Sequence, residues 1–124
     1  MSDTGINQEL TDVRWGTGMP AVVMIGADML RVRARGTFSV TVEDIQKLNS
    51  KIEDLTTLKG RLTSLFVSKV TDSISELGAE VSDINEILGA SEKIASAVKT
   101  QMEPLLQEMG LRLMGFSVEA VEKM

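Results

Sequence analysis

The alternation of apolar and polar residues from Leu30 to Val42 is the clearest pattern in the chain. Its even-numbered positions are apolar, apart from Gly36, and its odd-numbered positions carry arginine or hydroxyl side chains. Successive side chains of a strand point to opposite faces, so the pattern predicts a long strand with one buried and one exposed face. Gly36 indicates a bulge, a bend or the close approach of another backbone.

A second, shorter strand is predicted from Ala21 to Ile25, an apolar run rich in valine. A turn at Gly26 would join it to the long strand as an antiparallel pair. The preceding segment, Val13 to Pro20, holds two glycines and a proline around the only tryptophan, which is typical of a turn-rich segment. Residues 1–12 are polar and show no periodicity, so we expect a disordered arm or a segment foreign to the domain.

After the long strand the spacing of apolar residues becomes helical. A short helix is expected at Ile45 to Ile52, followed by a long amphipathic helix from Leu55 to Leu77. Gly78 is a natural carboxyl-terminal cap for the long helix. Gly60 lies within it and lowers helix propensity, so a start near Arg61 is the alternative.

The last third of the chain predicts a second long helix and a returning strand. Apolar positions from Ser91 to Met109 again follow helical spacing, with a short turn of helix before Gly89. From Leu111 to Val121 the apolar positions alternate, but their parity changes across Gly115, which indicates a β-bulge. We therefore predict one α+β domain over residues 13–124, with a twisted antiparallel sheet of three to four strands and two to three amphipathic helices on one face.

Composition removes several classes of function. The 124 residues include no cysteine and no histidine, which excludes thiol nucleophiles, disulfides, Cys/His zinc sites and histidine-based acid–base catalysis within this chain. Its carboxylates flank helix starts or lie on polar faces, and no glycine motif for binding phosphate is present. We therefore expect no enzyme, no cofactor and no metal site.

The net charge of −5 arises entirely in the second part of the chain, since residues 1–42 hold four basic and four acidic side chains. An acidic domain has no general attraction for phosphate backbones, which argues against nucleic acid as a partner. The longest nearly uncharged run, Gly16 to Ala27, is too short to cross a bilayer as a helix, and Met1 to Leu10 does not resemble a signal peptide. We expect the chain in the cytoplasm or peripherally at the cytoplasmic face of a membrane.

Arg31, Arg33 and Arg35 are the most suggestive group of side chains. They share one face of the predicted strand at intervals of about 7 Å and could bind lipid phosphates, RNA or the carboxylates of a partner. The alternative is that they form the solvated face of an antiparallel sheet, paired with acidic residues on neighbouring strands. No aromatic residue lies between them, so the stacking used to bind single-stranded nucleic acid is absent from this strand.

Apolar side chains of the two long helices are expected mainly to fill the core. Any excess apolar width, or an adaptable surface of methionines near the last helix and strand, would instead form a contact between copies of the chain. The candidates for such self-association are Leu58, Leu62, Leu65, Met102 and Met109.

Several short motifs, in this order, are similar to those of the stomatin, prohibitin and flotillin domain, also called the SPFH or band 7 domain. They are Arg14-Trp-Gly-Thr17, the strand from Leu30 to Val42, Ser75-Glu-Leu-Gly78, the segment from Leu105 to Leu111, and Gly115-Phe-Ser-Val118. The arginine-alternating strand with its Gly-Thr-Phe-Ser more narrowly resembles the bacterial branch labelled virion-core-protein-like. The resemblance covers Val13 to Val121.

This resemblance implies a non-enzymatic scaffold domain that mediates assembly between proteins. It implies a homo-oligomer in the full-length form, unnamed protein partners, and peripheral attachment to a membrane through flanking segments. The alternative from the residues themselves is a soluble module that recognises polyanions, either RNA or anionic lipid headgroups, with the face of Arg31, Arg33 and Arg35.

Overall fold

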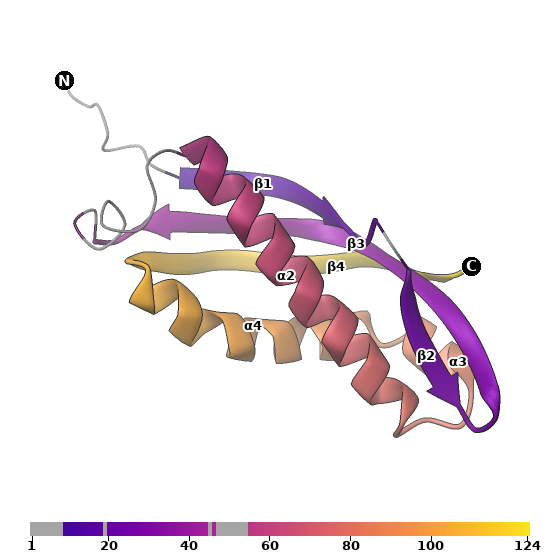
Figure 1. The fold of residues 1–124 in the computed structure, drawn as a ribbon. Helices are drawn as coiled ribbons and strands as arrows, with labels where there is room; N and C mark the ends of the chain where they lie inside the picture. The colour runs from indigo at the N-terminus through magenta and orange to yellow at the C-terminus, as the bar shows by residue number, and fades with distance from the viewer. Residues whose placement is uncertain (1–8, 19, 45, 47–54) are drawn as a thin grey trace.

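The computed structural model describes residues 9–18, 20–44, 46 and 55–124 (Figure 1). Three strands come first, helices follow, and one strand returns. The elements are β1 (Glu9–Gly16), β2 (Ala21–Ile25), β3 (Asp28–Val42), α2 (Leu55–Gly78), α3 (Ile84–Leu88), α4 (Ser91–Glu108) and β4 (Leu111–Lys123). This order confirms the predicted α+β class.

β3 is the central strand of a four-stranded antiparallel sheet. β1 and β2 lie one after the other along one edge of β3, with β2 opposite its first residues and β1 opposite its last. β4 runs along the other edge, from Leu111 opposite Val42 to Lys123 opposite Val32. Within the described residues, the outer edges of β1, β2 and β4 pair with no further strand.

The two faces of β3 differ as the alternation predicts. Val32, Ala34, Phe38 and Val40 are at most 4% exposed, while the arginines between them are exposed. The helices cover the buried face, with α2 crossing the strands and α4 lying beside β4 (Figure 1). The other face of the sheet is open to solvent, which is common for antiparallel sheets.

Gly36 allows two neighbours to approach β3 closely. A Cβ atom at this position would overlap the carbonyl oxygen of Ser117 in β4 and would lie 2.8 Å from Cζ2 of Trp15. A register shift in the pairing with β4 also falls between Arg35 and Gly36. The structure thus confirms both a bulge and a close backbone approach at this glycine.

A stack of four aromatic rings fills the space over this glycine. Trp15 stacks on Phe116 with ring centroids 5.4 Å apart, and Phe116 stacks on Phe66 at 5.0 Å. Phe66 in turn stacks on Phe38 at 4.5 Å. These are all the aromatic residues of the chain. Because they come from β1, β4, α2 and β3, the stack fixes the helix layer on the sheet.

The predicted arm over residues 1–12 requires a correction, because β1 begins at Glu9 and continues as far as Gly16, into the segment expected to be turn-rich. The register shifts between Leu10 and Val13. Asp12, between them, has a φ of 48° and donates its N–H to Oγ of Ser39 at 2.9 Å. This irregularity places the inward side chains of Leu10 and Val13 three residues apart instead of two. The sequence of β1 therefore shows no regular alternation. Residues 1–8 lie outside the described part.

The predicted helices agree with the structure in the residues that it describes. α2 begins at Leu55, the earlier of its two predicted starts, and ends at Gly78. α3 is the predicted short turn of helix, and its capping box joins Asp83 and Glu86. α4 spans Ser91–Glu108, one residue less than predicted. The helix predicted at Ile45 to Ile52 lies, except for Gln46, outside the described residues.

Candidate functional site

Arg31, Arg33 and Arg35 form a row on the open face of the sheet. Their side chains are exposed because the odd positions of β3 point away from the helices. In the sheet register, Arg31 lies opposite Val22 of β2, and Arg33 lies opposite Glu122 of β4. The structure therefore brings the three predicted residues together on one accessible surface.

Glu122 is the only carboxylate directly opposite a member of this arginine row in the described sheet, yet it forms no ion pair with Arg33. The ion pair observed among the described residues joins Nε of Arg112 to Oε1 of Glu43 at 3.7 Å, at the other end of β4. Both of its side chains are exposed, so it contributes little to stability. The expected cross-strand neutralisation of the row is not observed in the described part of the chain.

A hollow of about 420 Å³ lies beside Arg33 and Arg35. It forms where β1 has ended and β2 has not yet begun, so this part of β3 faces the connecting segment instead of a strand. Gly16 and Gly18 line the hollow without side chains that could fill it. Arg33, Arg35 and one carboxylate, Glu122, also line it, so guanidinium groups outnumber carboxylates and the balance favours an anionic oxygen group.

Thr17 holds the wall of this hollow in place. Its N–H donates to the carbonyl oxygen of Ala34 at 3.0 Å, and its Oγ1 accepts from the N–H of Ala34 at 3.0 Å. Thr17 is 6% exposed, so these bonds are shielded from water. The segment between β1 and β2 therefore continues the sheet's hydrogen bonding at Thr17, while Gly16 and Gly18 on either side of it line the hollow.

Exposed apolar side chains gather beside the arginine row. Met24 of β2 lies directly opposite Met29 of β3, next to the turn that joins the two strands. Val22 lies opposite Arg31, and the N–H of Met124 donates to the carbonyl oxygen of Arg31 at 2.9 Å. Among the described residues, five large apolar side chains are at least 46% exposed, and these four are among them.

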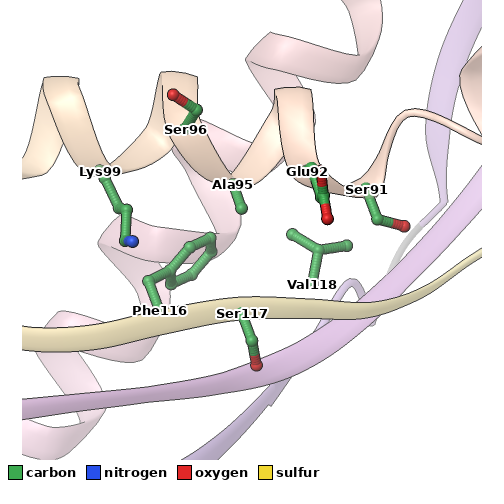
Figure 2. Close-up of a pocket in the computed structure, with 8 residues that line it drawn as sticks. All are labelled: Ser91, Glu92, Ala95, Ser96, Lys99, Phe116, Ser117 and Val118. Atoms are coloured by element: carbon green, nitrogen blue, oxygen red, sulfur yellow. The ribbon is translucent and has the colours of Figure 1, made fainter.

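A second hollow, of about 350 Å³, lies between α4 and β4 (Figure 2). Phe116 and Val118 point from β4 toward α4, whereas Ser117 points to the other face of the strand. The facing residues of α4 include Ser91 and Ala95, which are too short to fill the space. Because only α4 and β4 line this groove, it lies on the outer side of β4.

Comparison with known protein families identifies the domain. The model of the SPFH domain–Band 7 family matches residues 6–123. The chain belongs to the SPFH domain–Band 7 family. A search of curated proteins found no match. The predicted family is confirmed, while the narrower virion-core-protein-like branch stays a prediction.

Family membership carries a general functional statement. SPFH domains are generally non-enzymatic, membrane-associated scaffolds, and they generally form homo-oligomers in membrane microdomains. No helix within the described residues of this SPFH domain is long and apolar enough to span a membrane.

The five predicted self-association residues of this SPFH domain lie in or against its core. Leu58, Leu62 and Met102 are at most 1% exposed. Leu65 and Met109 are half-buried and pack against the same core. A second copy could reach the first three only if the helix layer opened, so the hypothesis of a contact through these residues narrows to Leu65 and Met109.

Sequence reasoning did not find the α4–β4 groove or the exposed apolar residues beside the arginine row. The available signal was parity: Met29 falls on the same face as Arg31 when the alternation is extended backward, and Val22 and Met24 alternate with the buried residues of β2. Only the register between β2 and β3 shows that these side chains are neighbours.

Proposed function

We propose that this SPFH domain is a non-enzymatic scaffold that self-associates, and assembles with other proteins, beside a membrane. The family match supports the scaffold role in general. The observation that supports self-association in this chain is the free outer edge of β4 together with the groove next to it. A strand edge with unpaired N–H and C=O groups binds another extended segment readily.

The regular part of β4 is the part that faces the groove. Its register shifts beside Met114 and Glu119, where the pairing with β3 skips one residue. Such bulges limit edge-to-edge pairing, but Gly115 to Val118 between them pair without interruption. A strand added along this stretch would place alternate side chains in the groove under α4.

The occupant that we propose for this edge is a strand of a second copy. The outer edge of β1 in the same sheet is also unpaired within the described residues, so each copy carries two different free edges. A contact between β4 of one copy and β1 of the next is heterologous, and repeated contacts of that kind form rings or filaments. This arrangement fits the homo-oligomers that SPFH domains generally form.

Val118→Lys tests this proposal. Val118 is half-buried and points into the groove, so a lysine there would place a charge where the added strand must pack. Sedimentation velocity over a range of concentrations should show concentration-dependent association of the wild-type chain and its loss in the variant. Met114→Lys is the matched control, because it adds the same charge to β4 at a position that is 58% exposed.

The proposal fails if the wild-type chain sediments as a single copy at high concentration. It also fails if both lysine variants lose association equally, since the groove would then have no special role. Circular dichroism of both variants excludes loss of the fold as the cause.

A second candidate function is a soluble module that recognises polyanions, either RNA or anionic lipid headgroups, with the face of Arg31, Arg33 and Arg35. The lack of ion pairs to these arginines among the described residues favours it. Of these two ligands RNA is the weaker candidate, because all four aromatic residues lie in the core and none is exposed for stacking. Fluorescence anisotropy with a labelled single-stranded RNA tests recognition of RNA: binding that disappears on Arg→Gln substitution would support it, and no binding at low salt would exclude it.

A further inference from the structure

We infer that the open sheet face, at the end of the β2–β3 hairpin, binds the surface of an anionic membrane. This inference rests on the proposed scaffold function and names the side of the scaffold that meets lipid. The surface combines exposed apolar and cationic side chains, and we call it the hairpin-end surface. Its residues are Val22, Met24, Met29, Arg31, Arg33, Arg35 and Met124.

The apolar part of this surface sits at a projecting tip. Met24 and Met29 are 50% and 64% exposed and lie beside the turn at Gly26, at one extremity of the molecule (Figure 1). Exposed apolar clusters on soluble proteins mark interaction sites. A projecting pair of flexible thioether side chains can enter the soft boundary between headgroups and acyl chains, which needs no complementary cavity.

The cationic part lies next to the tip on the same open face of the sheet. Arg31 follows Met29 by two residues on the same face, a rise of about 7 Å. With the open face lying on the membrane, Met29 can enter the acyl boundary while Arg31, next to it on the same face, reaches the headgroups. Arg33 and Arg35 continue the row, and the hollow of about 420 Å³ beside them can accept a headgroup phosphate.

Acidic groups near the hairpin-end surface are too few to cancel its charge. Glu122 lines the hollow, opposite Arg33. Asp28, at the start of β3, has the parity of the residues that face the helices rather than that of the arginines. The local balance on the open face is therefore positive, although the whole chain carries a net charge of −5.

The distribution of charge also argues against a second copy of the chain as the partner of the hairpin-end surface. Two copies placed face to face would oppose one arginine row to another, and like charges directly opposite each other repel. The helix layer, by contrast, is acidic, because residues 55–108 hold eight acidic and five basic side chains. An anionic surface would attract the sheet face and repel the helix layer, which orients the domain as it approaches.

Vesicle flotation with the full chain tests the inference, at about 0.1 M salt. Vesicles of phosphatidylcholine containing phosphatidylglycerol should bind the wild-type chain, and vesicles of phosphatidylcholine alone should bind it much less. The triple variant R31Q/R33Q/R35Q should lose on the order of 100-fold in partitioning, since each basic residue near an anionic surface contributes about fivefold. The variant M24S/M29S should lose about tenfold, because two apolar side chains no longer enter the bilayer boundary.

The matched control is K59Q/R61Q/K93Q, which removes the same charge from exposed positions of the helix layer that line neither the groove nor the hairpin-end surface. It should bind as the wild-type chain does. Equal losses in the two triple variants would mean that net charge alone governs binding, and would overturn the inference. Failure of the wild-type chain to float with anionic vesicles would also overturn it, including the case in which the three arginines prove to bind RNA instead.

Sedimentation of the same variants separates this inference from the proposed scaffold function. A chain that associates with itself but does not bind vesicles refutes the membrane surface alone. A chain that binds vesicles through the hairpin-end surface yet stays a single copy refutes self-association alone. The arginine variant should keep the wild-type melting temperature, because the three side chains are exposed and form no ion pair within the described residues.

Discussion

Replacing Gly36 by alanine should strongly destabilise this SPFH domain. The added Cβ would overlap the carbonyl oxygen of Ser117 and lie 2.8 Å from Cζ2 of Trp15. This carbonyl oxygen is part of the backbone of β4, which pairs with β3 along its length. The backbone at Ser117 therefore cannot move aside without loss of sheet hydrogen bonds. Trp15 can move only by disturbing its stacking on Phe116.

The expected loss follows from overpacking of a buried site. Extra methyl or methylene groups in a well-packed core typically cost about 1–3 kcal/mol. Because both a backbone and a ring must shift at Gly36, we expect the upper end of that range, about 3 kcal/mol. The lower conformational entropy of the unfolded alanine chain offsets at most about 1 kcal/mol. The net destabilisation is therefore about 2 kcal/mol or more.

Urea denaturation measures this loss, with the fluorescence of Trp15 as the probe. Trp15 is the only tryptophan and is 3% exposed, so unfolding changes its surroundings completely. Two glycines serve as controls, since a Cβ at Gly60 or at Gly115 would have no neighbour within 4 Å. Gly60→Ala should stabilise the domain by up to about 1 kcal/mol through helix propensity, and Gly115→Ala should leave it almost unchanged.

Unfolding of Gly36→Ala at the same urea concentration as the wild-type chain would contradict this prediction. A loss of the same size in Gly115→Ala would also refute it, because strand glycines would then matter for their backbone freedom and not for the space that they leave. An unchanged slope of the transition is needed for either comparison.

Two further substitutions test contacts that hold the candidate surfaces in place. Thr17→Val should destabilise the domain by about 1–2 kcal/mol, because the buried N–H of Ala34 loses its acceptor. In thermal unfolding, Thr17→Ser should melt closer to the wild-type temperature, since its hydroxyl keeps the acceptor. Equal melting temperatures of the two variants would contradict a role for this hydrogen bond. Phe66→Ala should cost about 3–5 kcal/mol, since Phe66 is fully buried within the aromatic stack. A calorimetric loss below about 1 kcal/mol would contradict the packing of Phe66 in the core.

The strand and helix pattern of this domain was predictable wherever a single period persisted. β3 keeps its alternation because one face meets the helices and the other meets water along its whole length. β1 was not predictable, because Asp12 shifts its register and hides the alternation. Periodicity therefore identifies the strands that run straight and misses the one that a bulge divides.

The candidate surface was predictable in its residues but not in its surroundings. The row of Arg31, Arg33 and Arg35 follows from parity alone. Whether an acid lies opposite it depends on the register of β4, which two bulges determine. The bulge at Glu119 takes that carboxylate out of the pairing and leaves only Glu122 opposite the row. A sequence shows that acidic residues are present in the returning strand, but not which arginine each of them faces.

The proposed contact between copies lies at the edge of β4, and the proposed membrane contact lies on the open face of the sheet. Because the two contacts use different surfaces, they can form at the same time. A strand added to the edge of β4 extends the sheet, so the open faces of two neighbouring copies point to the same side apart from the twist of the sheet, about 20–25° per strand. The acidic helix layers then lie together on the other side, away from an anionic membrane. Each added copy contributes another hairpin-end surface to the same bilayer, so association through β4 raises membrane affinity without any new contact to lipid. An assembly of this kind would be held at the membrane by many weak contacts, each of which a single copy makes only briefly.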